Sequence, residues 1–293
     1  MVNLQMNKEL SEILEKNHLS SNIISAHSVG GGCVSSAYEV KTSDSSYFIK
    51  INSPDFANNF KSEFMGLQKI HETNAILCPT PFATGIHKNH SYLVMSILPS
   101  LGGGTSALGA PLAKMHLAGQ SKQFGFPEPT YCGATLLDNT MTDQPWSEWF
   151  AEHRIGKILQ DIGPKKITKY PVKDICQAIA AELRSHDPDV TPSLVHGDLW
   201  NGNCGTSEGK PCIFDPAVYY ADPEVDLAMT ELFGGFGQRF FYSYQTVRPI
   251  PDGYERRKEI YNLFHVLNHA YMFGGYYCSE AASIIDSIMQ HHK

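Results

Sequence analysis

Long apolar runs are missing from this chain of 293 residues. Nowhere do about 18 consecutive apolar residues occur, which is the length that a membrane-spanning helix needs. The first 17 residues include five charged side chains and lack the unbroken apolar core of a secretory signal peptide. We therefore expect no membrane span, no membrane partner and no secretion signal.

Paired cysteines are missing as well. The seven cysteines are an odd number, and no two of them form a C-x-x-C pair. Cys204 and Cys212 come closest to a spaced pair, but no second pair completes a zinc site. We expect reduced thiols and a cytoplasmic location.

Positive charge is scarce: 23 Lys and Arg face 30 Asp and Glu, for a formal net charge of -7. A broad nucleic-acid surface needs clustered basic residues, so nucleic acid is not an expected partner. A local basic pocket for a small phosphate compound stays open. The remaining composition, 42% apolar and 18% charged, is typical of an ordinary globular protein with one or two domains.

The first third of the chain is patterned mainly as strands. After a helical stretch at 7–17, "IISAHSVGGGCVSSAYEV" (23–40) predicts strand, glycine-rich turn and strand, and "SSYFIKI" (45–51) predicts a third strand. A helix is expected at 58–73 and a further strand in "HSYLVMSIL" (90–98). Residues 1–98 should form a small sheet-rich lobe.

The rest is patterned mainly as helices. Amphipathic spacing marks 108–119, 145–162, 172–186, 224–236 and 253–273, and the short strands "SLVHGD" and "KPCIFDP" interrupt the series. We therefore predict an α+β fold of two lobes, with a larger and mainly helical lobe over 99–293.

One stretch, "LVHGDLWNGNCG" (194–205), fits neither a helix nor a strand. His196, Asp198 and Asn203 match H-x-D-x-x-x-x-N, the pattern of a kinase catalytic loop. Asp198 could accept a proton from a substrate hydroxyl, and the Asn203 amide oxygen could bind Mg²⁺. Twelve residues later, Asp215 ends an apolar run, where a kinase keeps its main magnesium ligand. The alternative is a turn in which these side chains bond the backbone.

Three further features precede this loop in the order that a kinase requires. Gly30, Gly31 and Gly32 lie between two strands and could cover phosphates, although a plain hairpin turn also favours glycine. Lys50 lies in a strand and Glu63 in the helix that follows, so the two could pair. Each has a simpler alternative as a solvated charge, but their order makes the combined signal strong.

The sequence resembles the fructosamine (ketosamine) kinase family, which belongs to the protein-kinase-like group that includes aminoglycoside phosphotransferases. The resemblance extends over nearly the whole chain. Its most specific motifs are "HGDLWNGN" (196–203) and "DPAVYYADPEVDLAM" (215–229), supported by "FGFPEPTYCGATLLDN" (124–139) and "YNLFHVLNHAYMFGGYY" (261–277). It implies a bilobal protein-kinase-like fold, with a nucleotide-binding lobe at 1–98 and a catalytic and substrate-binding lobe at 99–293.

The resemblance also implies a role for each matching residue. Asp198 is the catalytic base, Asn203 and Asp215 hold Mg²⁺, and Lys50 with Glu63 positions the phosphates of ATP. Backbone groups of a hinge bind adenine, and Asp226 orients the catalytic loop. The alternative for Asp226, which does not exclude this role, is a carboxylate at a helix N-terminus that the helix dipole stabilises. The hinge residues are Met95, Ser96 and Ile97.

Two positions depart from the family pattern. Ser96 stands where an acidic hinge residue is frequent, but because recognition there uses the backbone, we expect ATP binding to survive. Ala221 replaces a frequent glycine, which would bring strain only if that position needs a positive φ.

The expected function is ATP-dependent phosphorylation of a sugar hydroxyl in a ketosamine, free or on a glycated protein. In the resembled family, phosphorylation at the sugar O3 makes the adduct unstable, which implies a role in deglycation. A kinase of a free sugar or another small alcohol stays open. A nucleotide-binding regulatory module without turnover is the alternative from another class.

Two side chains carry more specific expectations. Trp200, two residues after the base, should border the acceptor, since aromatic faces pack on sugars and attract a protonated amine; its alternative is a core tryptophan. Cys33, directly after the glycines, could be a redox-sensitive thiol because an electropositive ATP site favours the thiolate; its alternative is an inert core cysteine. The chain would then be a monomer, or a homodimer that forms under oxidation.

Overall fold

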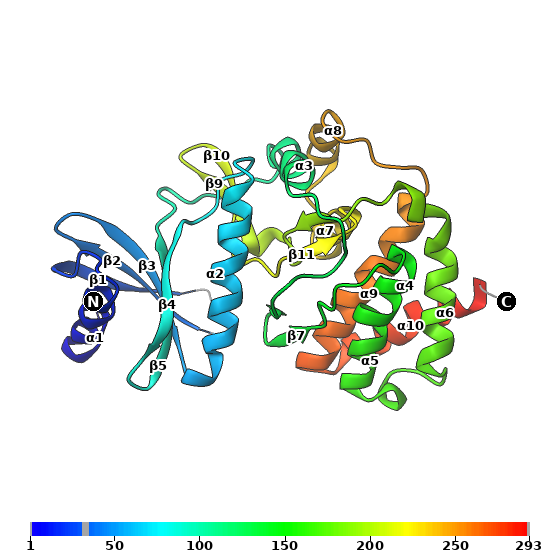
Figure 1. Cartoon of the computed structure of the whole chain (residues 1–293), viewed down its shortest axis with the longest axis horizontal. Coiled ribbons are helices and arrows are strands. Elements are labelled where there is room, and N and C mark those ends of the chain that lie inside the picture. Colours follow the sequence, from blue (N-terminus) through cyan, green and yellow to red (C-terminus); the bar gives the residue numbers. More distant parts are fainter. Residues whose placement is uncertain (1, 31–34, 292–293) are drawn as a thin grey trace.

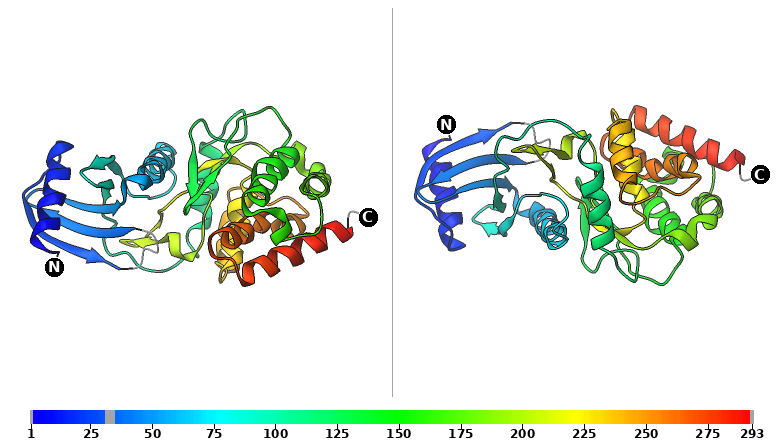
Figure 2. Two further views of the ribbon diagram at one scale, coloured as in Figure 1. Left: turned by 90° about the horizontal axis from the view of Figure 1, so that it is seen from below. Right: turned by 90° about the horizontal axis from the view of Figure 1, so that it is seen from above.

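The computed structural model describes residues 2–30 and 35–291 and has a sheet at one end and a bundle of helices at the other (Figure 1). Two views at right angles to the first show the same separation, with the amino terminus at the sheet end and the carboxyl terminus at the helical end (Figure 2). Among the described residues, no helix is both long and apolar enough to span a membrane.

Five strands form the sheet, and each pairs antiparallel with its neighbours in the order β1-β2-β3-β5-β4. They are β1 (Ile23–Val29), β2 (Ser36–Thr42), β3 (Ser46–Asn52), β4 (Pro81–His87) and β5 (His90–Ser96). Successive side chains of a strand point to opposite faces. In β3, Tyr47, Ile49 and Ile51 are therefore buried on one face, and Lys50 points to the other.

A helix covers each face of this sheet (Figure 1). α1 (Leu4–Lys16) packs Leu10, Ile13 and Leu14 into a cluster with the buried residues of β3. α2 (Ala57–Glu72) lies on the opposite face, so its Glu63 is on the same side as Lys50. The strand periodicity and the helix position thus bring two charged side chains together.

The remaining helices form the second end of the molecule. They are α3 (Gly109–Ala118), α4 (Trp146–Phe150), α5 (Lys157–Ile162), α6 (Val172–Leu183), α7 (Glu224–Leu232), α8 (Gln238–Gln245), α9 (Tyr254–Phe273) and α10 (Tyr276–His291). A π-helical turn, Ala151–Gly156, joins α4 to α5. Trp146, Trp149 and Phe150 are buried in the core, as their helical spacing predicts.

Three small two-stranded antiparallel sheets, all within the described residues, complete the fold. β8 (Ser193–Val195) pairs with β11 (Tyr219–Ala221), β9 (Cys204–Ser207) with β10 (Lys210–Ile213), and β6 (Thr130–Cys132) with β7 (Thr135–Leu137). Ala221 is a buried strand residue and is not among the residues with positive φ, so alanine brings no backbone strain there. The sequence patterns gave no sign of β4, β6 or β7, which are short or only partly buried.

One apolar core connects the two ends. It includes Phe60 and Leu67 from α2 and Met95 from β5, together with the buried side chains of the helical end. The cluster beneath α1 is separate from it. The proposed lobe boundary after residue 98 therefore follows the end of the sheet, whereas packing continues across it.

Candidate functional site

The H-x-D loop follows β8 and is held by one buried carboxylate. Asp226, on the first turn of α7, accepts hydrogen bonds from the backbone N–H of His196 (2.7 Å) and of Gly197 (2.9 Å). The Nε2 of His116 lies 3.1 Å from the same carboxylate. Gly197 has φ +80°, and a Cβ there would lie 2.2 Å from the Ala217 oxygen, so only glycine fits. This contact supports the loop-orienting role expected for Asp226.

His196 joins this loop to the segment that carries Asp215. Its Nε2 lies 2.9 Å from the carbonyl oxygen of Phe214, and its Nδ1 accepts from the backbone N–H of Asp198 at 3.3 Å. These partners fix one neutral tautomer, with the proton on Nε2. Burial lowers the pKa of His196, which also favours the neutral ring.

Asp198 lies in this frame with its side chain partly buried. Asn203 donates through Nδ2 to the Asp198 carboxylate (3.1 Å) and to the Asp198 carbonyl oxygen (2.9 Å). Burial raises the pKa of Asp198, the Asn203 hydrogen bond opposes this rise, and the charges of Asp215 and Asp226 add to it. The resulting pKa is about 7. A carboxylate with a pKa near neutrality is suited to accept a proton from an alcohol.

Lys50, Glu63 and Asp215 meet where the sheet faces the catalytic loop. The Lys50 ammonium lies 2.7 Å from Glu63 and 2.5 Å from Asp215. Desolvation opposes the charge on Lys50, but the two carboxylates together raise its pKa, so it stays an ammonium. Burial raises the pKa of Glu63 to about 7, which the Lys50 charge opposes. Three residues far apart in sequence thus form one charged cluster.

Asp215 is the strained member of this cluster, with φ +57° in the left-handed region. Non-glycine residues in that conformation are uncommon and gather at functional sites. The Asp215 side chain is 46% exposed, more than either partner. Desolvation favours its neutral form, but Lys50 outweighs this and lowers the pKa of Asp215, so it remains a carboxylate. With the Asn203 amide it offers hard oxygen atoms, a donor set that fits Mg²⁺.

The other expected nucleotide contacts lie along the sheet. Gly30 directly follows β1 and has open space around it, whereas Gly31, Gly32 and Cys33 lie outside the described residues. At the end of β5, the Ser96 N–H donates to the Thr80 oxygen, and the Ser96 hydroxyl accepts from the Thr80 N–H, both at 2.8 Å. Any hinge contact with adenine must therefore use other backbone groups of residues 95–97.

Trp200 is exposed rather than packed in the core. Its side chain keeps 40% of its surface accessible, and the ring lies against Gly202, where a Cβ would be 2.3 Å from it. The core alternative is therefore wrong for Trp200. The next residue, Asn201, reaches the carbonyl oxygen of Phe233 at 3.5 Å, and the Phe233 ring lies 4.9 Å from that of His269. The loop that carries Asp198 and Trp200 thus contacts the residue that follows α7.

Other residues near Asp198 were not predicted from the sequence. Cys132 of β6 and His265 of α9 have atoms within 4.8 Å of the Asp198 carboxylate and of one another. Both residues lie within motifs that carry the family resemblance, at 124–139 and 261–277, so the resemblance could have indicated them. Their spacing alone, 66 and 67 residues on either side of Asp198, gives no such indication.

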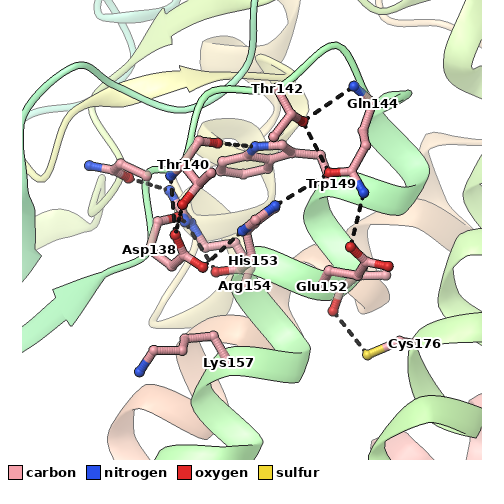
Figure 3. A network of polar contacts seen from close by, with 12 residues as sticks. Asp138, Thr140, Thr142, Gln144, Trp149, Glu152, His153, Arg154, Lys157 and Cys176 are labelled. Carbon is pink, nitrogen blue, oxygen red and sulfur yellow. Dashed lines mark hydrogen bonds and ion pairs between the residues drawn. The ribbon is translucent and has the colours of Figure 1, made fainter.

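A polar network around Arg154 connects the π-helical turn to the loop that follows β7 (Figure 3). Arg154, on the π-helical turn, is buried between the rings of Trp149 (4.6 Å) and Tyr219 (3.9 Å). It donates to Asn139 Oδ1 at 2.9 Å, and Asn139 Nδ2 donates to Thr130 in β6 at 2.6 Å. A buried arginine thus fixes the strand that carries Cys132.

Asp138, the first residue after β7, contacts the same π-helical turn (Figure 3). Its carboxylate lies 2.8 Å from His153 Nδ1 and accepts from the Thr140 hydroxyl at 2.7 Å. Its carbonyl oxygen accepts from Arg154. Desolvation favours the neutral acid, but the hydrogen bonds from His153 and Thr140 outweigh this and lower the pKa of Asp138.

Comparison with known proteins identifies first the fold class and then the family. The structure superposes with a TM-score of 0.85 on a crystal structure named "Putative fructosamine-3-kinase" from Haemophilus somnus, which is 27% identical, over 95% of this chain and 96% of that one. An aminoglycoside phosphotransferase, in a complex with ADP and hygromycin B, shares the fold with a TM-score of 0.63 at 14% identity, over 96% of this chain and 97% of that one. The predicted bilobal, protein-kinase-like fold is confirmed.

The sequence comparisons give the family. A family model described as "Fructosamine kinase" matches residues 6–291. A "Probable ketoamine kinase" of Vibrio vulnificus is 38% identical over 96% of this chain and 94% of its own length. A "Protein-ribulosamine 3-kinase, chloroplastic" of Oryza sativa is 36% identical over 92% of this chain and 80% of its own length. The chain belongs to the fructosamine kinase family and is an ATP-dependent small-molecule kinase, as the motifs predicted.

Proposed function

We propose that this protein transfers the γ-phosphoryl group of ATP to a sugar hydroxyl of a ketosamine, with Asp198 as the base. The observation that carries the proposal is the arrangement around Asp198. Its backbone is held by Asp226 and His196, its carboxylate by Asn203, and its pKa is raised to about 7. Such a group takes a proton readily and is poorly suited to a purely structural ion pair.

Each described residue of the cluster has a part in the transfer. Lys50, oriented by Glu63, contacts the α- and β-phosphates. Asn203 and Asp215 would hold Mg²⁺, which when bound neutralises charge on the phosphates. Gly30, together with Gly31 and Gly32, would cover the phosphates through backbone N–H groups. Met95, Ser96 and Ile97 would supply the backbone contacts to adenine.

The reaction is one displacement at phosphorus. Asp198 accepts the proton of the acceptor hydroxyl as the oxygen bonds to the γ-phosphorus, and the bond from that phosphorus to the β–γ bridging oxygen of ATP breaks. The products are the phosphorylated sugar, ADP and one proton, which leaves Asp198 later. Little covalent chemistry falls to the protein, so positioning and charge supply most of the acceleration.

The acceptor surface favours a sugar joined to an amine. Trp200 is exposed next to the base, and an indole face can pack on the apolar face of a sugar and attract an ammonium group. The relative named a protein-ribulosamine kinase supports glycated protein as one acceptor, with phosphorylation at O3 and a role in deglycation. A free sugar remains the second candidate acceptor, because the residues that bind ATP do not contact the amine of a ketosamine.

The lobe division and the location are part of this proposal. Residues 1–98 would bind the nucleotide, and 99–293 would carry the base and the acceptor. A cytoplasmic location and a monomer, or a dimer formed under oxidation, stay predictions; the plant relative is named as chloroplastic.

The test is turnover by Asp198→Asn on a panel of ketosamines and free sugars. We expect a loss of at least about a hundredfold with ATP binding nearly intact, a typical size for removal of a general base. Asp189→Asn, an exposed residue just before β8, is the matched control and should keep full activity. Turnover by Asp198→Asn within a factor of two of wild type would exclude this assignment. ATP binding by the wild type with no turnover on any acceptor would favour the regulatory module.

A further inference from the structure

A buried group of potential metal ligands adjoins the catalytic base. One ligand atom each from Cys132, Asp198 and His265 lies within 4.8 Å of the other two. Cys132 is 3% and His265 4% exposed, and the three come from β6, the catalytic loop and α9. Nothing in the proposed phosphoryl transfer uses the thiol or this imidazole. The proposed reaction therefore does not explain why Cys132 and His265 lie beside Asp198.

His265 is an unsatisfied member of the cluster. Its Nδ1 is buried and has no hydrogen-bond partner in the part of the chain that the structure describes. Burial lowers the pKa of His265 to about 3, so the ring is neutral, the form that binds a metal. A buried nitrogen without a partner is costly unless something else satisfies it. Separately, one nitrogen of this ring lies within 4.8 Å of the Cys132 sulfur and of an Asp198 oxygen, where a metal ion would bind it.

Cys132 has a supporting hydrogen bond. The Asn268 amide nitrogen lies 3.3 Å from its sulfur. The Asn268 oxygen accepts from the Thr135 hydroxyl at 2.5 Å, which fixes the amide so that its N–H group faces the sulfur. Burial raises the pKa of the Cys132 thiol, so a metal must displace its proton. Once that proton has left, the Asn268 N–H stabilises the thiolate, as outer hydrogen bonds do in metal sites.

We propose that Cys132, His265 and Asp198 bind one zinc-like transition-metal ion, and that this ion inhibits the enzyme by occupying the base. Sulfur, imidazole and carboxylate are ligands that Zn²⁺ accepts, whereas Mg²⁺ prefers oxygen alone. Bond lengths of about 2.0–2.3 Å place tetrahedral ligand atoms roughly 3.3–3.8 Å apart. Atoms that already lie within 4.8 Å need only small movements. Binding releases the thiol proton and, where the Asp198 carboxyl is protonated, that proton as well, and water completes the coordination.

The inhibition has a definite kinetic form. A carboxylate bound to the ion cannot take the proton of the acceptor hydroxyl, and the ion occupies the acceptor side of the loop. Inhibition should therefore compete with the sugar and be little affected by excess MgATP. The proposed metal site does not depend on the proposed function. The inhibition does, because it requires Asp198 to be the base.

Direct binding is tested with Cd²⁺, a soft analogue whose bond to a thiolate gives an ultraviolet charge-transfer band. The purified wild-type chain, reduced with a phosphine so that no added thiol competes, should show the band at one ion per chain. Cys132→Ser should lose this band. His265→Asn should weaken binding at least about tenfold. Cys176→Ser is the control, because this partly buried cysteine of α6 bonds the Ala151 carbonyl oxygen and lies outside the cluster.

Activity is then measured with Zn²⁺ in excess MgATP, each variant against its own rate without zinc. The zinc concentration for half inhibition should rise at least about tenfold in Cys132→Ser and in His265→Asn, and stay unchanged in Cys176→Ser. A one-to-one Cd²⁺ band retained in Cys132→Ser, or no such band in the wild type, would overturn the site. If Cys132→Ser fails to fold, as judged by circular dichroism, His265→Asn decides. One bound Cd²⁺ in a chain inactive on every acceptor would refute the proposed function and leave the site standing.

Discussion

Replacing Asp226 by asparagine tests whether the catalytic loop depends on one buried carboxylate. Asp226 is 1% exposed and contacts three groups: the N–H of His196 at 2.7 Å, the N–H of Gly197 at 2.9 Å and His116 Nε2 at 3.1 Å. Burial opposes its charge, but the hydrogen bond from His116 outweighs this and lowers the pKa of Asp226, so it is a carboxylate near neutral pH. Asparagine keeps the shape, replaces one acceptor oxygen by an NH₂ donor and removes the charge.

The contacts set the size of the effect. In either orientation of the amide, at least one loop N–H faces a donor and loses its charged acceptor. A hydrogen bond to a charged group contributes about 1.5–3 kcal/mol, and an unsatisfied buried donor costs about 1–3 kcal/mol. We therefore expect Asp226→Asn to lower the free energy of unfolding by about 2.5–6 kcal/mol. At about 2–4 °C per kcal/mol, Tm falls by roughly 5–24 °C.

Activity should fall as well, because the two amides position the chain that leads to Asp198. A misplacement of about 1 Å can cost about a hundredfold in rate, so we expect a loss of that order in kcat with a smaller change in the ATP KM. Thermal unfolding and steady-state kinetics provide the readouts. Glu255→Gln in α9 is the control, since its side chain is 82% exposed and its ion pair with Lys258 contributes at most about 1 kcal/mol.

One outcome would refute this reasoning. If Asp226 acts only as a carboxylate at the start of α7, the helix dipole accounts for about 0.3–1 kcal/mol, and kcat is unaffected. A stability loss in that range, with kcat within a factor of two of wild type, would show that the loop holds its shape without Asp226. A large stability loss with unchanged kcat would limit Asp226 to folding.

Four further predictions have sharp readouts. Asp215→Ala should abolish turnover, and chelator should stop the wild type until Mg²⁺ is restored; full turnover in excess chelator would exclude the magnesium mechanism. Trp200→Ala should raise the sugar KM much more than the ATP KM, whereas equal changes would argue against an acceptor wall. Mild peroxide should inhibit the wild type reversibly, with ATP protecting, but not Cys33→Ser; equal rates of loss would exclude Cys33 as the sensor. Desolvation opposes the charge on His186, but the Asp222 carboxylate outweighs desolvation and raises the pKa of His186 above 6.5. Burial likewise opposes the charge on Asp222, but His186 outweighs burial and lowers the pKa of Asp222 below 3.8. The stability from the His186 charge is thus present below about pH 6.5 and lost as pH rises through the folded pKa, so His186→Gln should cost more stability at about pH 6 than at about pH 9 in denaturant titrations, and an equal cost would contradict the assignment.

The strands and helices of the site could be predicted because their patterns are local. Alternation in "FIKI" predicts a strand with Lys50 on the face opposite to its apolar neighbours, and β3 has this form. The helix expected at 58–73 is α2, Ala57–Glu72. The H-x-D-x-x-x-x-N spacing predicted a loop after a short strand, and β8 precedes it.

Long-range contacts could not be predicted in this way. Neither Cys132 nor His265 has a local pattern that relates it to Asp198, because the hairpin β6–β7 and α9 reach the base only through the packing of the helical end. Arg154 looks like a surface residue of an amphipathic helix. The π-helical turn and the rings of Trp149 and Tyr219 make it a buried cation instead.

The sequence by itself determined the two-part α+β organisation, the family and the order of the residues that we propose for phosphoryl transfer, because periodicity and motif spacing are properties of neighbouring residues. Only the tertiary structure decided which charges meet. It brought Lys50 to Asp215 across 165 residues, exposed Trp200, and set the pKa of Asp198 near 7. Burial and the distance between charges determine such properties, and both depend on how segments far apart in the chain pack together.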